Sequence, residues 1–165
     1  TLTSIANEFS NFAQMPKATI SEIDIKEVLR STCELFSETV EVDVVFAAND
    51  PNEAIILGDK EQLNRVFSNL IKNAIQAIPD DRRGIIKVEL VPKGNAHLII
   101  VKDNGTGITT EIEKKIFSPN FTTKSTGAGL GLAMVKQIVD NHTGQIYFET
   151  QIGEGTTFYV ELPNR

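Results

Sequence analysis

Hydrophobic residues recur along this chain with two different periods, and each period predicts a different kind of element. From Lys60 to Ile78 they recur every three or four positions, which indicates a helix with one broad buried stripe. Asp59 and Gln62 are typical of the cap that begins such a helix, and Pro79 ends it. The stripe consists of Leu63, Val66, Phe67, Leu70, Ile71, Ala74 and Ile78.

Two further helices are predicted on similar grounds. Asp24, followed by Glu27 three residues later, marks the start of a helix that runs to about Glu38. The other extends from Leu130 to Asn141, directly after a glycine-rich stretch. The inward-facing residues of the earlier helix are predicted to include Val28, Leu29 and Phe36.

Short segments with strand character lie between the helices. They occur in neighbouring pairs, and turns at residues 92–95 and 153–155 join two of these pairs. Because helices stand in blocks between the pairs, we expect an α+β fold, a two-layer sandwich of one mixed sheet with helices on one face. The predicted strands are Val42–Phe46, Ala54–Leu57, Ile85–Val91, Ala96–Lys102, Gln145–Thr150 and Thr156–Leu162.

The first residues of the chain predict a separate helix, which Pro16 stops. Its apolar residues follow the three-then-four spacing of a coiled-coil or helical-bundle seam. The helix either packs on its own domain or is the end of a longer dimerisation helix, and we favour the second interpretation. We therefore expect residues 1–16 to be the remnant of a dimerisation helix and residues 17–165 to form one domain. The seam residues are Leu2, Ile5, Phe9 and Phe12.

Composition narrows the function classes. Of the 165 residues, 41% are hydrophobic and 23% charged, which is ordinary for a globular domain. Apolar runs such as Leu98 to Val101 are too short to cross a membrane, and the polar start shows no secretory signal. The net charge of −6 argues against nucleic-acid binding. A bound polyanion would need local donors or a metal ion.

The single cysteine, Cys33, excludes an internal disulfide. It lies on a predicted amphipathic helix, so core packing is the simplest interpretation. A reducing compartment fits, and we expect the chain to lie in the cytoplasm. The sequence does not say whether a longer parent protein is anchored in a membrane.

Two asparagines lie at the margin of the long helical stripe. Asn69 and Asn73 are four residues apart, so their side chains lie one above the other. Asparagine weakens a helix interior, which makes the pair unusual at this position. They are either solvated amides or acceptors at the rim of a cleft, where Asn73 could bind Mg²⁺ beside substrate phosphates.

A second candidate lies at the end of the strand Ala96–Lys102, where the sequence reads DNGTGI from Asp103. Asp-Asn-Gly is strong turn chemistry by itself. Alternatively, the Asp103 carboxylate accepts a hydrogen bond from an exocyclic amine, while Gly105 and Gly107 let a flat ring approach the backbone. Such a charged bond contributes about 1.5–3 kcal/mol and favours adenine over guanine.

A third candidate is the glycine-rich stretch before the last helix. A polar loop that ends at a helix N-terminus suits phosphate, and Lys124 adds a positive charge. The stretch is not a P-loop, since no GxxxxGK[ST] occurs in the chain. It is not a dinucleotide fingerprint either, because Leu132 stands where the third glycine belongs. The HRD and DFG motifs of protein Ser/Thr/Tyr kinases do not occur.

The order of these motifs resembles the catalytic and ATP-binding domain of two-component sensor histidine kinases, in the GHKL ATPase superfamily. The resemblance covers about Ile23 to Pro163, and the stretch IANEFSNFAQMP before it resembles the second dimerisation helix of nitrogen-regulation-type sensors. The matching motifs are NLIKNAIQAI (Asn69–Ile78), DNGTGI (Asp103–Ile108), IFSPNFTTK (Ile116–Lys124), GAGLGLAM (Gly127–Met134) and GEGTTF (Gly153–Phe158).

The resemblance implies a site for ATP and Mg²⁺. Asp103 would bind the adenine amino group, and Thr156 would lie on the adenine side. Asn73 would ligate Mg²⁺, with Asn69 and Lys124 as further catalytic residues near the phosphates. Residues 118–128 would form an ATP lid anchored by Phe117 and Phe121. The remaining nucleotide-binding residues implied are Gly105, Gly107, Ile108, Thr122, Thr123, Gly127, Gly129, Leu130, Gly131 and Leu132.

Asn69 also bears on the reaction that the resemblance implies. Hydrolysing members of the superfamily carry Glu at this position, where it activates water, and an amide cannot act as that base. Phosphoryl transfer to another protein group is therefore favoured over hydrolysis. An ATPase and a nucleotide-binding module without transfer activity remain the alternatives.

The acceptor of the phosphoryl group is predicted to lie on a separate, histidine-bearing dimerisation domain. His97 is placed in a strand, and His142 is placed near the C-terminal end of a helix, where a partly positive ring is favoured. Neither stands in the HExxxP context that the family phosphorylates. The implied partners are that dimerisation domain in a homodimeric parent, and the receiver domain of a response regulator.

Overall fold

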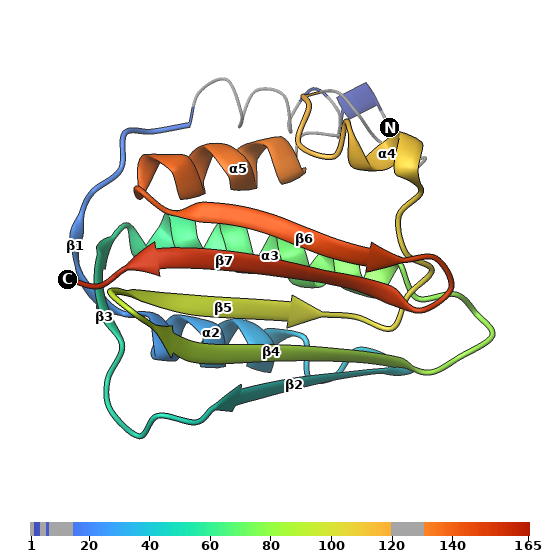
Figure 1. The fold of residues 1–165 in the computed structure, drawn as a ribbon, viewed down its shortest axis with the longest axis horizontal. Helices are drawn as coiled ribbons and strands as arrows, with labels where there is room; N and C mark the ends of the chain where they lie inside the picture. The colour runs from blue at the N-terminus through green and yellow to red at the C-terminus, as the bar shows by residue number, and fades with distance from the viewer. Residues whose placement is uncertain (1, 4–5, 7–14, 120–130) are drawn as a thin grey trace.

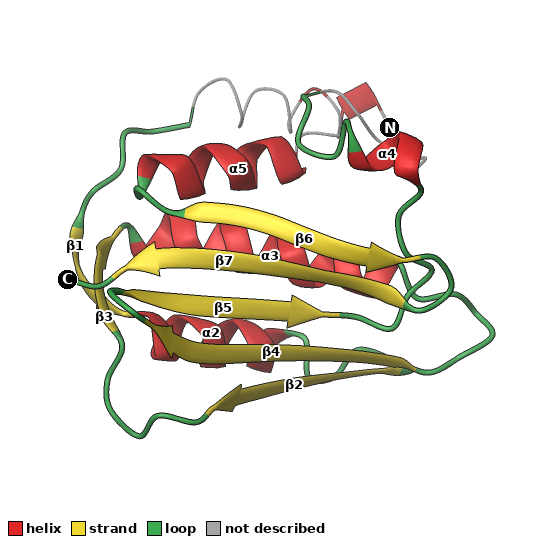
Figure 2. Cartoon of the chain, viewed as in Figure 1, coloured by secondary structure: helices red, strands yellow, loops and turns green. Residues whose placement is uncertain are grey.

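The computed structural model describes residues 2–3, 6, 15–119 and 131–165. Its two layers are a five-stranded sheet and a set of helices on one face of that sheet, as predicted (Figures 1 and 2). The helices are α2 (Ile25–Leu35), α3 (Lys60–Gln76), α4 (Thr110–Glu113) and α5 (Gly131–Asn141). The strands are β1 (Ser21–Asp24), β2 (Val42–Ala48), β3 (Ile55–Gly58), β4 (Gly84–Lys93), β5 (Ala96–Lys102), β6 (Gln145–Gln151) and β7 (Gly155–Pro163).

The five-stranded sheet has the order β2-β4-β5-β7-β6. Only β2 and β4 run parallel, and the other neighbours are antiparallel, so the sheet is mixed. Strand β3 lies outside it and pairs antiparallel with β1 in a two-stranded sheet. The sequence pattern did not reveal β1, because its residues SEID lack the hydrophobic alternation of a strand, and so it placed β3 in the larger sheet.

Helix α3 forms the centre of the helical layer. Every member of its predicted stripe except Ile78 is buried, and Phe67 is among the largest side chains with no exposed surface. Truncating such a residue costs about 3–5 kcal/mol. Cys33 is also buried, and burial, with Glu34 beside it, raises the pKa of its thiol to about 11. The thiol therefore belongs to the core.

The N-terminal cap of α3 joins three segments of the chain. Asp59 Oδ1 accepts a hydrogen bond from Gln62 N at 3.1 Å, as the sequence predicted, and Oδ2 accepts one from Thr19 N at 2.7 Å. The backbone N–H of Asp59 donates to His142 Nε2 at 3.0 Å. The side chain of Gln62 donates to Pro16 O at 3.0 Å. The segment before β1 is thereby attached to the first turn of α3 and to the end of α5.

His142 follows the last turn of α5, as predicted. Nδ1 lies 2.8 Å from Ile138 O, and Nε2 lies 3.0 Å from Asp59 N, so the ring joins the end of α5 to the start of α3. Gly58 makes room for this ring, because a Cβ there would lie 3.1 Å from His142 Cδ2.

The predicted N-terminal helix lies mostly outside the described residues, including Ile5, Phe9 and Phe12. Met15 is described and packs against the hydrophobic core. The boundary between residues 1–16 and 17–165 stays a prediction.

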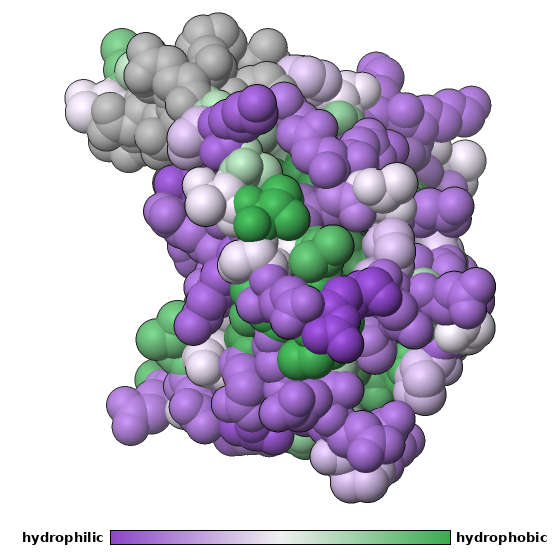
Figure 3. Space-filling model, turned by 90° about the vertical axis from the view of Figure 1, so that its left-hand side faces the viewer, coloured by the Kyte–Doolittle hydropathy of each residue, from purple (hydrophilic) through white to green (hydrophobic). Residues whose placement is uncertain are grey.

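The side of the molecule that carries β1, β3 and the C-terminus shows apolar surface among hydrophilic surface (Figure 3). Leu57 lies on β3 and is 52% exposed, and the exposed Ile20 directly precedes β1. Across the stretches that the structure describes, no helix has the length and apolar character needed to cross a membrane.

Asp59→Ala should lower the free energy of unfolding by about 1–2 kcal/mol, because the variant loses the cap of α3. Asp59→Asn keeps a capping oxygen and is the matched control for charge. Burial by itself raises the pKa of Asp59, but the backbone N–H groups of Thr19, Gln62 and Glu61 outweigh it and hold the pKa below its ordinary value of 3.8.

A carboxyl group with a lowered pKa stabilises the fold above pH 3.8. This contribution is lost as the pH falls through the pKa of the folded state. Urea unfolding at pH 7 and at pH 3 should therefore show that the advantage of the wild type over Asp59→Asn shrinks in acid. An advantage that grows in acid would contradict the assignment.

Candidate functional site

The site is built around a buried carboxylate where β5 ends. Asp103 continues the pairing of β5 with β7, since its N–H donates to Thr156 O at 2.9 Å. Its side chain is 6% exposed. Oδ1 accepts hydrogen bonds from Gly105 N at 2.8 Å and from Thr156 N at 3.1 Å. None of the described residues donates to Oδ2, which is therefore the oxygen open to a ligand.

Burial governs the ionisation of this carboxyl group. It raises the pKa of Asp103, while the N–H groups of Gly105 and Thr156 act in the opposite direction. A charge that is poorly solvated gains more from a new hydrogen bond than a surface charge does. Oδ2 is accordingly a strong acceptor for an N–H donor of a ligand.

The glycines after Asp103 are required by close backbone packing. A Cβ at Gly105 would lie 2.6 Å from Ala77 O, at the end of α3. Gly107 has φ +79°, and a Cβ there would lie 2.5 Å from Gln151 O. At Gly155, with φ +134°, the Cβ would lie 2.1 Å from Asp103 O. The loop from Asp103 is thus wedged between α3 and the turn that joins β6 to β7.

Two residues that the sequence analysis did not single out fasten this loop. Arg82 Nη1 donates to Asn104 O at 3.1 Å and to Gly153 O at 2.9 Å. Asn104 Oδ1 accepts a hydrogen bond from Ile85 N at 2.8 Å. In the sequence, Arg82 belongs to a charged stretch that ends a helix and Asn104 to a turn, so neither carried a signal for this role.

A pair of threonines lies next to the carboxylate. Thr156 on β7 faces Thr150 on β6, and their hydroxyl oxygens are 2.9 Å apart. Thr150 Oγ1 also accepts the N–H of Ile108 at 2.8 Å. Thr156, predicted on the adenine side, is thus brought to Asp103. Thr150 was not predicted.

The two asparagines lie on successive turns of α3, as their spacing predicted. Asn69 Nδ2 donates to Arg65 O at 2.8 Å, and a Cβ at Gly131 would lie 3.0 Å from Asn69 Oδ1. The carbonyl oxygen of Asn69 therefore faces the N-terminus of α5. Asn73 is also held by an interaction.

One row of α3 connects the two ends of the site. Asn69, Asn73 and Ala77 are spaced by four residues, so they follow one another along a single face. Asn69 lies beside Gly131, and Ala77 lies beside Gly105. Eight residues of helix rise about 12 Å. The row thus runs from the first turn of α5 to the Asp103 loop.

The segment before the predicted lid is anchored by aromatic contacts. The ring of Phe117 packs edge-on against Phe148 at 6.0 Å and Phe158 at 6.5 Å between centroids. Ile108 and Leu132 pack against the core. The predicted residues that lie outside the described part of the chain are Phe121, Thr122, Thr123, Lys124, Gly127, Gly129 and Leu130.

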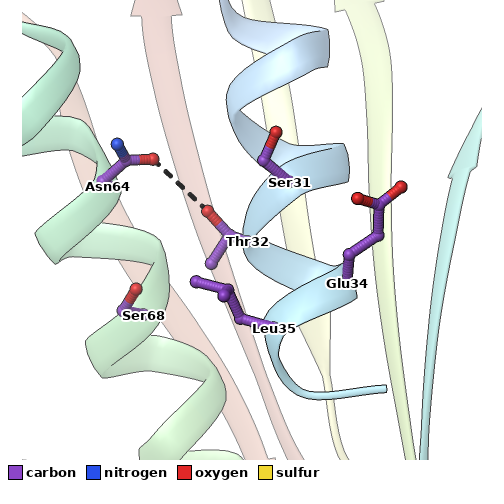
Figure 4. Close-up of a pocket in the computed structure, with 6 residues that line it drawn as sticks. All are labelled: Ser31, Thr32, Glu34, Leu35, Asn64 and Ser68. Carbon is purple, nitrogen blue, oxygen red and sulfur yellow. Dashed lines mark hydrogen bonds between the residues drawn. The ribbon is translucent and has the colours of Figure 1, made fainter. Parts of the chain in front are cut away.

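A groove of about 460 Å³ lies between α2 and α3, on the other flank of α3 from the asparagine row. Figure 4 shows Thr32 and Leu35 of α2 directed towards α3, with Thr32 Oγ1 3.5 Å from Asn64 Oδ1. Its one charged residue, Glu34, repels phosphate. The groove does not contribute to the site around Asp103.

A mixed sheet with helices on one face is also the architecture of a histidine kinase catalytic domain among the solved structures. The family model of the histidine kinase-, DNA gyrase B- and HSP90-like ATPases matches residues 58–165. The chain belongs to this family, in agreement with the resemblance of its motifs.

Individual relatives and solved structures agree with this assignment. Sensor histidine kinase ZraS of Escherichia coli is 35% identical over 165 residues, covering 98% of this chain and 35% of that protein. Nitrogen regulation protein NtrY of Azorhizobium caulinodans is 35% identical over 147 residues, covering 86% of this chain and 19% of that protein. The chain thus corresponds to about a third or less of these curated relatives.

Among solved structures, the catalytic domain of histidine kinase ThkA superposes with a TM-score of 0.77 at 31% identity. The match covers 88% of this chain and 98% of that domain. ThkA in complex with response regulator protein TrrA gives a TM-score of 0.81 at 28% identity, covering 99% of this chain and 47% of that one.

Asp103→Asn should leave the fold as stable as the wild type or more stable. The Asn oxygen keeps the two N–H bonds, and the poorly solvated charge is removed. Asp103→Leu is the contrasting variant, because it leaves two buried N–H groups without an acceptor at a cost of about 1–3 kcal/mol each.

The pH dependence should be opposite in sign to that of Asp59. A carboxyl group with a raised pKa favours the fold when protonated, and this contribution is lost as the pH rises through the pKa of the folded state. Urea unfolding should show Asp103→Asn gaining on the wild type between pH 4 and pH 7. A loss of stability in Asp103→Asn at pH 7 would refute the role given to burial.

Proposed function

We propose that this chain is the catalytic domain of a sensor histidine kinase, which binds ATP and transfers its γ-phosphoryl group to a histidine on a separate dimerisation domain. The observation that carries the proposal is the α3 row, because it joins the acceptor at Asp103 to the helix N-terminus at Gly131. A nucleotide needs a binding site for its base and another for its phosphates, and the two ends of this row can supply them. The names of ZraS and ThkA as histidine kinases support the same activity.

The Asp103 end suits the adenine base. Oδ2 is an acceptor on a largely buried side chain, and the exocyclic amine of adenine is a donor, whereas guanine presents an oxygen at that position. The end at Gly131 suits phosphate, because the first N–H groups of a helix have no acceptor within the helix and its N-terminus is the positive end of the dipole. The chain thus offers acceptors to the base and donors to the phosphates.

The residues present also fit Mg²⁺. The side-chain amide of Asn69 is turned so that its N–H side bonds the helix and its oxygen faces the N-terminus of α5. Within the described ranges there is no cluster of three or more His, Cys, Asp or Glu. Amide oxygens with substrate phosphates are an appropriate ligand set for this ion, which takes few protein ligands. When bound, the ion would neutralise phosphate charge, with Asn73 as its ligand.

Asn69 favours transfer over hydrolysis. Its amide is occupied with Arg65 O and cannot take a proton from water. Transfer between bound partners depends on positioning and charge neutralisation, which this chain supplies without a base. An ATPase would need a carboxylate at this place on α3.

The proposal extends to the arrangement of the parent protein. Residues 1–16 would be the end of a dimerisation helix, and residues 17–165 the catalytic domain of a homodimer. A response-regulator receiver domain would be the next partner, as the complex of ThkA with TrrA suggests. We infer that this domain lies in the cytoplasm, which a site for ATP and the buried, free Cys33 support.

Mixing the chain with the histidine-bearing dimerisation domain of its parent and γ-labelled ATP tests the activity. We expect label on that histidine, carried by the separate domain. Asp103→Asn is the nucleotide-deficient control and should bind ATP about tenfold to a hundredfold more weakly, because a charged hydrogen bond is replaced by two opposed donors. Tight ATP binding without label would indicate a regulatory module, and release of free phosphate alone an ATPase.

Asn73→Ala tests the metal ligand. ATP affinity measured by calorimetry should fall about tenfold with Mg²⁺ present, equivalent to about 1.4 kcal/mol, and should change little with EDTA. Asn64→Ala is the matched control, since it lies on the same helix and faces the groove beside α2. An equal loss with and without Mg²⁺ would remove Asn73 from the metal site.

A further inference from the structure

Thr150 lies in the same cross-strand row as Asp103 and Thr156, next to the proposed adenine end of the site. The two threonines pair across β6 and β7, and Thr156 N donates to the Asp103 carboxylate. Alternation along each strand places these side chains on the helix-covered face, one step beyond Phe148 and Phe158. The three polar groups form the edge of the core nearest the Asp103 loop.

Two groups compete for the hydroxyl proton of Thr150, and the distances favour one of them. Oγ1 accepts the N–H of Ile108 at 2.8 Å, so one lone pair is used. Its single proton has two acceptors, Thr156 Oγ1 at 2.9 Å and Gly155 O at 3.3 Å. Hydroxyl bonds are ordinarily 2.5–3.0 Å long, so the proton favours Thr156.

This direction determines what Thr156 offers to a ligand. If Thr150 donates to Thr156 Oγ1, the proton of Thr156 cannot return to Thr150 and is available to the cleft. Each bond in such a chain polarises the next, so the Ile108 N–H strengthens both hydroxyl donors. Thr156 then presents a donor beside the carboxylate acceptor of Asp103.

We propose that Thr150 is a positioning residue that sets the Thr156 hydroxyl as a donor to the purine base. The inference rests on the proposed function and deepens it. Adenine presents a donor, its amino group, next to an acceptor, its ring nitrogen N1. Asp103 and Thr156 present the complementary acceptor and donor, directly or through one water. Through Thr156, Thr150 thereby lets the site recognise N1 of adenine in addition to the amino group that Asp103 recognises.

The probe is 1-deaza-ATP, which keeps the amino group and replaces N1 by CH. Calorimetry gives the dissociation constants of ATP and of 1-deaza-ATP, and their ratio isolates the bond to N1. For the wild type we expect a ratio of about three to ten in favour of ATP, the range of one neutral hydrogen bond. In Thr150→Val the ratio should fall to below about two, and in Thr150→Ser it should return to the wild-type value.

Thr157→Val is the matched control, because the residue lies on the opposite face of β7 and should leave the ratio unchanged. A purely structural role of Thr150 would weaken both ligands equally, and an unchanged ratio in Thr150→Val therefore overturns the inference. So does a wild-type ratio of one, which stands as a test even if Thr150→Val fails to fold. If the wild type binds no ATP at all, the proposed function is refuted. That outcome is read from the ATP dissociation constant itself and is separate from the ratio.

Discussion

The structure depends on holding one carboxylate where water reaches it poorly. Asp103 closes the β5 strand with its side chain among core residues, so Oδ1 must be satisfied by the backbone of Gly105 and Thr156. That requirement fixes the sharp turn after the strand. The main chain of this turn packs against the end of α3 at Gly105 and against the end of β6 at Gly107, where only glycine fits. The site is therefore a consequence of backbone packing around the Asp103 carboxylate. Oδ1 is used by the backbone, and Oδ2 is the oxygen left for a ligand.

Helix α3 relates this carboxylate to the other end of the cleft. The face that carries Asn69, Asn73 and Ala77 contacts α5 at one end and the Asp103 loop at the other. Of the remaining faces, one is buried in the core, one borders α2, and one, with Glu61, Lys72 and Gln76, is exposed. Because seven residues of the helix are buried, the separation between the two ends is fixed before any ligand arrives. Pre-organisation of this kind reduces the ordering cost of binding.

Local patterns predicted much of this arrangement. The stripe and cap of α3, the class of fold and the position of Asp103 follow from periodicity and turn chemistry within a few residues. Strand β1 was missed because its residues SEID include only one apolar side chain, so no hydrophobic alternation marks it. Arg82 and Thr150 were missed because their partners Gly153 and Ile108 lie 71 and 42 residues away. Contacts at that separation leave no trace in the surrounding sequence. The glycines of the loop were predicted for ring contact, while the structure gives them a packing role as well.

The shared aspartate at the start of α3 has a mechanical consequence. Thr19 and Pro16 are tied to the first turn of α3, and the same turn holds the ring at the end of α5. A force applied to the chain ahead of residue 16 would therefore be transmitted to α3 and α5 through these hydrogen bonds. The opposite end of α3 lies beside the Asp103 loop, and the opposite end of α5 begins at Gly131 beside Asn69. Tension from outside the domain would therefore act on the two helices that join both ends of the proposed nucleotide site.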